Sequence, residues 1–281
     1  MNIRKWLIIS ERRLAMNNLT ELANKLLGDG TATKVIGYEE AHGKTRPCFC
    51  TEAADTGRLV LDERCTNNIA VYLTKPEIVG GHKVAVTATL PVLRTMVQLA
   101  MENQLPDGTT AIVSTEGGEG LAVLPTVGDM ERVVAGTPLD ISGKERELRE
   151  RLKAMSREER WQFWLGEMSR CIKCYACRAA CPLCYCTRCI VDNNCPQWIQ
   201  PWASPLASME WQISRVMHMA GRCVACGACK QACPMGIPIH LLTLSLAEDI
   251  QNEFGVAPGS VMDHGNVLST FKPGDKEDFI R

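Results

Sequence analysis

Two cysteine-rich stretches decide how the C-terminal half of this chain folds: CIKCYACRAACP at 171–182 and CVACGACKQACP at 223–234. Both stretches have the pattern CxxCxxCxxxCP. Two residues separate the first cysteine from the second and the second from the third, three residues separate the third from the fourth, and a proline follows the fourth. The same run therefore occurs twice, about fifty residues apart. Twelve of the fifteen cysteines lie between Cys171 and Cys233, and such crowding indicates metal or redox chemistry.

This spacing is that of the bacterial ferredoxin run, and it predicts two 4Fe–4S clusters. Three thiolates on one tight loop reach three corners of a cubane. The fourth cysteine lies on a segment that leads away, so it reaches the other cluster. The predicted ligand sets are therefore crossed: Cys171, Cys174, Cys177 and Cys233 for the first cluster, and Cys223, Cys226, Cys229 and Cys181 for the second.

Structural zinc and disulfides are the alternative interpretations of these cysteines. Zinc sites usually pair two CxxC units and need neither the third CxxC nor the CxxxCP ending, so the full pattern favours clusters. Disulfides would require an oxidising compartment, and no export signal is apparent. The only uninterrupted apolar residues near the start are Trp6–Ile9, too few for a signal peptide or a transmembrane segment. A cytoplasmic location is therefore expected.

Four further cysteines follow the first run in CPLCYCTRCIVDNNC (181–195). They could bind a third 4Fe–4S cluster or a zinc ion, completed by Cys48, Cys50 or Cys65. The other interpretation is that they are small buried residues packing beside the clusters. Their spacing fits no standard run, so both interpretations stay open for Cys184, Cys186, Cys189 and Cys195.

The N-terminal half shows the pattern of a small α/β domain. Strands are expected at 34–38, 68–74, 83–89 and 110–114, and a helix is expected to begin at Pro91. Strand, helix and strand at this spacing indicate a βαβ unit in a parallel or mixed sheet. A formal net charge of −1 gives no indication of nucleic-acid binding.

The fold class is therefore α+β: a small α/β domain followed by a bacterial-type dicluster ferredoxin-like domain with flanking helices. Two capping boxes, Ser142 with Glu145 and Ser156 with Glu159, predict charged linker helices. The second of these helices is expected to carry Trp161, Trp164 and Leu165 towards the cysteine domain. The expected divisions are 1–140 (with 1–15 as an extension), a linker at 141–165, the cluster domain at 166–250 and a surface arm at 251–281.

The stretches RCIKCYACRAACPLCYCTRCIVDNNCPQW (170–198) and HMAGRCVACGACKQACPMGIPIHLL (218–242) resemble one family. It comprises the iron–sulfur beta subunits of formate dehydrogenases and deazaflavin-linked hydrogenases, with their heterodisulfide-reductase-associated relatives. The segments at 34–49, 65–75 and 83–105 follow the order of that family's N-terminal domain. The resemblance implies a cytoplasmic multi-subunit complex of anaerobes, in which electrons pass between a flavoprotein, hydrogenase or formate dehydrogenase and a second redox subunit.

The N-terminal half departs from the family where the relatives carry cluster ligands. Thr89–Val92 replaces a Gly-Cys-Asp stretch, Ser114 replaces a cysteine, and a further cysteine pair is missing, so that only Cys65 remains. This half is therefore expected to be a docking scaffold without a cluster or a flavin. Because all eight inferred ligands follow residue 170, residues 140–281 are expected to hold both clusters alone.

The sequence thus predicts a non-catalytic subunit that relays single electrons. One alternative is a catalytic flavin- or deazaflavin-dependent oxidoreductase subunit with its substrate in the N-terminal half. The other is an assembly module in which the clusters are only structural. The sequence identifies neither the electron donor nor the acceptor.

Overall fold

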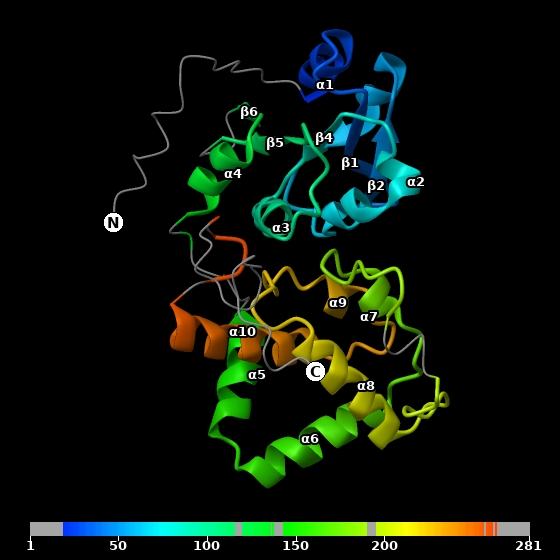
Figure 1. Cartoon of the computed structure of the whole chain (residues 1–281), viewed down its shortest axis with the longest axis vertical. Coiled ribbons are helices and arrows are strands. Elements are labelled where there is room, and N and C mark those ends of the chain that lie inside the picture. The colour runs from blue at the N-terminus through cyan, green and yellow to red at the C-terminus, as the bar shows by residue number, and fades with distance from the viewer. Residues whose placement is uncertain are drawn as a thin grey trace, which may run out of the picture.

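The structure is a computed structural model of the whole chain, and it contains a mixed sheet and many helices (Figure 1). It describes residues 19–115, 120–135, 137, 143–189, 195–255, 257–260 and 262. The extension expected at 1–15, Ser142 of the first capping box, and most of the arm expected at 251–281 lie outside these residues. The α+β class predicted from the sequence is confirmed.

The N-terminal half is a six-stranded mixed sheet in the order β2-β1-β4-β5-β6, with the short β3 paired to β1. Strands β1, β4 and β5 are parallel neighbours, whereas β2 and β6 run antiparallel at the two edges. The strands are β1 Lys34–Ala41, β2 Lys44–Cys50, β3 Leu59–Val60, β4 Val84–Thr87, β5 Thr110–Ser114 and β6 Leu121–Leu124.

Alternate residues of the central strands enter two different cores, because neighbouring side chains of a strand point to opposite faces. Val35 and Ala85 pack with helix α1 (Leu19–Gly28) on one face. Ile36 and Val86 pack on the other face, against α3 (Leu90–Met101). Helix α3 begins at Leu90, one residue before the expected Pro91, and connects the parallel strands β4 and β5, which confirms the βαβ unit.

The strand predicted at 68–74 is wrong. These residues form a 3-10 helix, η3 (Ile69–Thr74). The Asn68 side chain accepts a hydrogen bond from the Ala70 N–H and donates one to Thr95 on α3, at 2.8 Å. A short polar side chain that bonds its own backbone in this way favours a turn over a strand.

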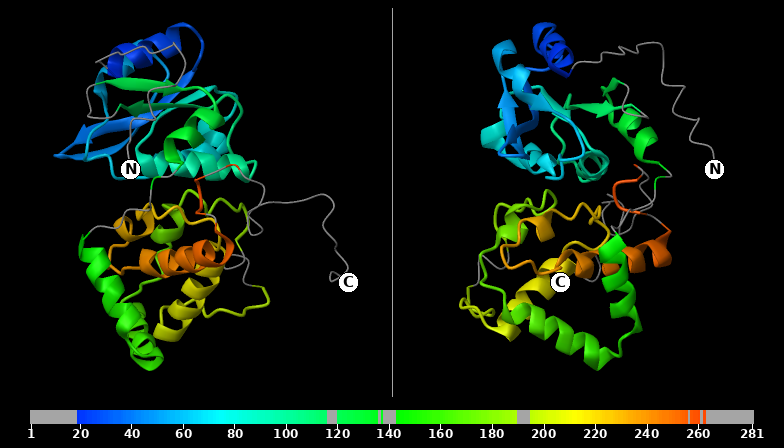
Figure 2. Two further views of the ribbon diagram at one scale, coloured as in Figure 1. Left: turned by 90° about the vertical axis from the view of Figure 1, so that its left-hand side faces the viewer. Right: turned by 180° about the vertical axis from the view of Figure 1, so that it is seen from behind.

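The C-terminal half is helical and lies below the sheet in Figure 1, with α3 on the side of the sheet that faces it. The two further views in Figure 2 show the same division. The remaining helices are η2 Ala53–Arg58, α2 Pro76–Val79, α4 Val127–Val134, α5 Gly143–Ala154, α6 Arg157–Ser169, α7 Ala176–Ala179, α8 Pro205–Met217, α9 Ala228–Gln231 and α10 His240–Phe254.

A buried ion pair joins the two halves. Glu102, next to the end of α3, accepts hydrogen bonds from Nε and Nη2 of Arg222, each at 2.7 Å. The Tyr185 hydroxyl donates to the same carboxylate at 2.7 Å, and the Arg222 guanidinium lies over the Tyr185 ring. A bidentate pair of this kind fixes orientation as well as adding energy. The described part of the chain has no helix that is both long and apolar enough to cross a membrane.

Candidate cluster sites

The two cysteine runs have the same backbone conformation. Lys173 and Ala225 occupy the same position, the third, in their two runs, and both have a left-handed φ, of 51° and 57° respectively. Two residues later, Tyr175 and Gly227 are also left-handed and precede the short helices α7 and α9. Alternating left- and right-handed residues direct successive N–H groups into one concavity, a form typical of iron–sulfur sites. The repeat seen in the sequence is therefore also a structural repeat.

The first cavity lies between the first run and the end of the second. Four cysteines line it, together with Tyr175 and with Trp211 and Gln212 of α8: Cys171, Cys174, Cys177 and Cys233. Burial raises the pKa of the Cys177 thiol, and the nearby Cys171 and Cys233 raise it further. Cys233, which belongs to the second run, therefore lies next to the loop formed by the first run.

The second cavity has a volume of about 730 Å³ and lies at the junction of the two halves. Its walls include Cys65, Thr89 and Pro91 from the N-terminal half. The cysteines of the cluster runs that line it are Cys223, Cys226, Cys229 and Cys181. Each cavity is thus bordered by three cysteines of one run and the fourth cysteine of the other.

Cys229 is buried at the second cavity, and Cys181, Cys223 and Cys226 are half-buried there. Burial raises the pKa of Cys226 to about 12 and also raises the pKa of Cys223 and Cys229. Cys181 differs, because a hydrogen bond from the Cys184 thiol lowers its pKa to about 6. The thiolate is the form that ligates metal, and a bound metal deprotonates its thiol ligands.

Helix α8 supplies polar groups to both cavities, and sequence reasoning missed them. The Gln212 amide donates to the Cys177 sulfur at 3.5 Å, and the Arg215 guanidinium donates to the Cys177 carbonyl at 3.2 Å. The indole N–H of Trp211 and two nitrogens of Arg215 are buried without a hydrogen-bond partner among the described residues. Such donors fit a group rich in sulfide acceptors. The only signal in the sequence was an arginine inside a largely apolar helix.

The remaining cysteines do not gather in one place. Cys184 packs beside Cys181 and the sulfur of Met219, whereas Cys186 and Cys195 are exposed. Within the described ranges, no three His, Cys, Asp or Glu side chains converge on a single metal ion. A cubane needs its cysteines at separate corners instead. The third cluster or zinc at Cys184, Cys186, Cys189 and Cys195 stays a prediction.

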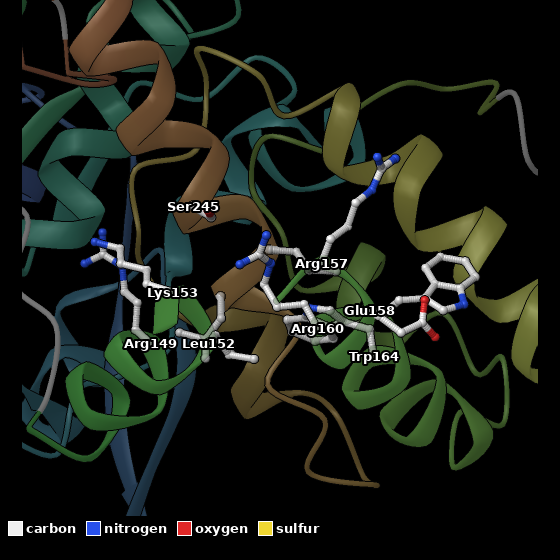
Figure 3. A pocket seen from close by; sticks show the side chains of 11 residues that line it. Arg149, Leu152, Lys153, Arg157, Glu158, Arg160, Trp164 and Ser245 are labelled. Carbon is white, nitrogen blue, oxygen red and sulfur yellow. The ribbon is translucent and has the colours of Figure 1, made fainter. Parts of the chain in front are cut away.

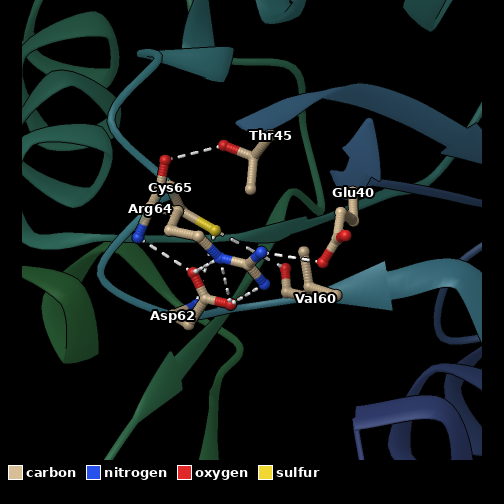
Figure 4. Close-up of polar contacts among 6 residues, drawn as sticks. All are labelled: Glu40, Thr45, Val60, Asp62, Arg64 and Cys65. Carbon is tan, nitrogen blue, oxygen red and sulfur yellow. Dashed lines mark hydrogen bonds and ion pairs between the residues drawn. The ribbon is translucent and has the colours of Figure 1, made fainter. Parts of the chain in front are cut away.

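Of the three N-terminal cysteines, only Cys65 lines a cavity that holds the cluster cysteines. Its sulfur accepts a hydrogen bond from the Asp62 N–H at 3.4 Å. Arg64 secures this loop through Asp62 and Glu40, and its carbonyl accepts from Thr45 (Figure 4). Cys48 and Cys50 instead lie in the core on the α1 side of the sheet.

A separate groove of about 900 Å³ lies between α5, α6 and α10 and is lined by no cysteine. Figure 3 shows four basic side chains along it: Arg149, Lys153, Arg157 and Arg160. Arg149 and Lys153 pair with Glu248 of α10. Trp164 borders this groove and also packs in the buried cluster that contains Cys177 and Cys229.

The tryptophans near the cysteines divide into two groups. Trp164 and Trp211 are buried beside the cluster cysteines. Trp161, Trp198 and Trp202 are exposed, by 40 %, 43 % and 60 % respectively. Of the α6 residues expected towards the cysteine domain, Trp164 and Leu165 pack in the buried cluster that contains Cys177 and Cys229, whereas Trp161 lines the open groove.

Comparison with known proteins agrees with this arrangement. Residues 170–238 match a family described as "4Fe-4S dicluster domain". Over 102 residues the chain is 34 % identical to the F420-dependent formate dehydrogenase subunit beta of Methanocaldococcus jannaschii, covering 36 % of this chain and 25 % of that protein.

A second relative gives a similar result. Over 96 residues the chain is 35 % identical to the F420-dependent formate dehydrogenase 1 subunit beta of Methanococcus maripaludis, covering 34 % of this chain and 24 % of the relative. The matched segment thus spans about a quarter of the length of these relatives. The C-terminal part of the chain is therefore a ferredoxin-type 4Fe–4S dicluster domain, and it makes this chain an iron–sulfur protein with partial homology to formate dehydrogenase beta subunits.

Proposed function

We propose that this chain is a non-catalytic electron-relay subunit that passes single electrons through two 4Fe–4S clusters. Cys171, Cys174, Cys177 and Cys233 would hold the first cluster, and Cys223, Cys226, Cys229 and Cys181 the second. The observation that carries the proposal is the pair of cavities, each bordered by a crossed set of four cysteines. The thiolates would supply the ligands, and the clusters would supply one-electron chemistry.

The residues around the cavities support a role in redox chemistry. Apolar packing and buried N–H donors are the features by which a protein sets the potential of a cluster. Trp211 and Gln212 border the first cavity, and Arg215 borders the second. The second cavity also touches the N-terminal half, which makes that half part of the protein shell around the cluster.

The partners in this proposal are other redox subunits of a cytoplasmic complex. The named relatives are beta subunits of formate dehydrogenases, which supports a partner of the formate dehydrogenase type. A hydrogenase, a flavoprotein or a heterodisulfide-reductase-like subunit would provide the same chemistry. Purifying the native complex and identifying its other subunits would select among them.

A catalytic deazaflavin subunit is the second candidate, because the relatives are named F420-dependent. The two candidates differ in what the purified chain can do alone. The relay should show no flavin absorbance, and it should accept electrons from dithionite but fail to turn over with a nicotinamide or deazaflavin donor. Bound flavin, or turnover of an acceptor dye by the isolated chain, would reject the relay in favour of the catalytic subunit.

A further inference from the structure

Arg215 is the one basic side chain of α8 that is buried between the two cysteine cavities. It is 6 % exposed, although arginine is almost never buried without a partner. One Nη donates to the Cys177 carbonyl, at the first cavity, while the residue itself lines the second. Its Nε and its other Nη have no hydrogen-bond partner in the part of the chain that the structure describes.

No carboxylate among the described residues forms an ion pair with Arg215. A buried guanidinium without an anion is costly, so its position indicates an anionic group nearby. Burial lowers the pKa of the Arg215 guanidinium, but the nearby Cys181 and Cys229, followed by Cys184 and Cys177, outweigh it and raise the pKa. A 4Fe–4S cluster with four thiolate ligands carries net negative charge and offers sulfur acceptors to the orphaned N–H groups.

The first cavity has a different set of donors on the same helix. Gln212 and Trp211 line it, and both side chains are neutral. Helix α8 therefore places its one basic side chain in the wall of the second cavity, while the same guanidinium touches the first cavity through its hydrogen bond to the Cys177 carbonyl. A positive charge and N–H···S hydrogen bonds both stabilise the more negative, reduced state of a cluster, and so raise its reduction potential.

We infer that Arg215 tunes the two clusters unequally: it raises the reduction potential of the cluster in the second cavity more than that of the cluster in the first. This inference rests on the proposed function, since it requires both clusters to be present.

The test is a redox titration of the full chain, followed by electron paramagnetic resonance, on matched variants. In Arg215→Gln, one midpoint potential should fall by at least the equivalent of a tenfold change in the ratio of oxidised to reduced cluster, about 59 mV for a one-electron couple. Arg215→Lys keeps the charge and should retain most of the potential. Arg157→Gln, which removes a charge from the separate groove between α5, α6 and α10, should change neither midpoint.

Gln212→Leu assigns the effect to a cavity, because the Gln212 amide donates to the sulfur of Cys177, a cysteine of the first cavity. It should lower the midpoint potential that changes less in Arg215→Gln, which is that of the first cluster. Equal shifts of both midpoints in Arg215→Gln, or no shift with both clusters intact, would overturn the inference. Iron content separates the two hypotheses: a wild-type chain without two clusters would reject the proposed function itself. If Arg215→Gln loses iron, the midpoint potentials of Arg215→Lys are compared with those of the wild-type chain instead.

Discussion

Cys181 and Cys233 are the two single residues on which the crossed arrangement depends. Cys181→Ala should remove the cluster of the second cavity, and Cys233→Ala that of the first, because each borders the cavity of the other run. Iron per chain should fall from about eight to about four in each variant, and the two remaining spectra should differ. If each change removed the cluster of its own run, the ligand sets would not be crossed.

A matched control for these variants is Cys186→Ala, because Cys186 is exposed and lies outside both cavities. If the chain holds only the two clusters, the iron content of Cys186→Ala should equal that of the wild-type chain. A loss of iron or of zinc in this control would instead support the third metal site predicted for the cysteines that follow the first run.

Glu102 is the residue whose loss should most weaken the junction between the two halves. The side chain of Glu102 is 6 % exposed, and the side chain of its partner Arg222 is 17 % exposed. Glu102→Gln leaves the guanidinium buried without an anion, which should lower the free energy of unfolding by about 3 kcal/mol. Chemical denaturation of the anaerobic protein measures this. Glu40→Gln, at the exposed Arg64 pair, should have a much smaller effect; equal effects would contradict the assignment.

At the scale of elements, helix α6 depends on a capping box at its start. The Ser156 hydroxyl accepts the Glu159 N–H, and the Glu159 carboxylate accepts the Ser156 N–H. Ser156→Ala should destabilise the protein by about 1 kcal/mol. Ser245→Ala, on an exposed position of α10, is the control. If Ser156→Ala and Ser245→Ala had the same free energy of unfolding, the cap would contribute nothing to stability.

The same cap gives α6 a dependence on pH. Hydrogen bonds with Ser156 hold the pKa of Glu159 below its ordinary value of 4.5. A lowered pKa in the folded state means that the stabilisation is complete above the ordinary pKa and is lost as the pH falls through the folded-state value. The destabilisation by Ser156→Ala should therefore shrink in acid.

The elements also show what a sequence can and cannot predict here. Strands β4 and β5 and helix α3 were predictable because their apolar residues have the right period and a proline marks the helix start. Strand β2 was not, because Pro47 lies within it; proline is tolerated there because β2 is an edge strand. The cysteine runs were predictable because local spacing alone determines their loops. Arg215 was not, since only tertiary packing shows that it lies between them.

At the scale of the whole molecule, the second cavity changes one expectation drawn from the sequence. Residues 140–281 contain all eight inferred ligands, but residues of the N-terminal half form part of the wall of the second cavity. A fragment of residues 143–281 should therefore keep the first cluster and expose the second to solvent. We expect faster loss of about four of its eight irons in air than in the full chain. Equal rates of iron loss would mean that the N-terminal half gives no protection.

The central claim is that this chain holds two redox-active clusters, and one reductive titration tests it most directly. The anaerobically purified full chain is analysed for iron and sulfide and is then titrated with dithionite, with electron paramagnetic resonance at each step. The account predicts about eight irons, about eight sulfides and about two electrons accepted per chain. A content of about four irons, or clusters that accept no electrons from dithionite, would contradict it.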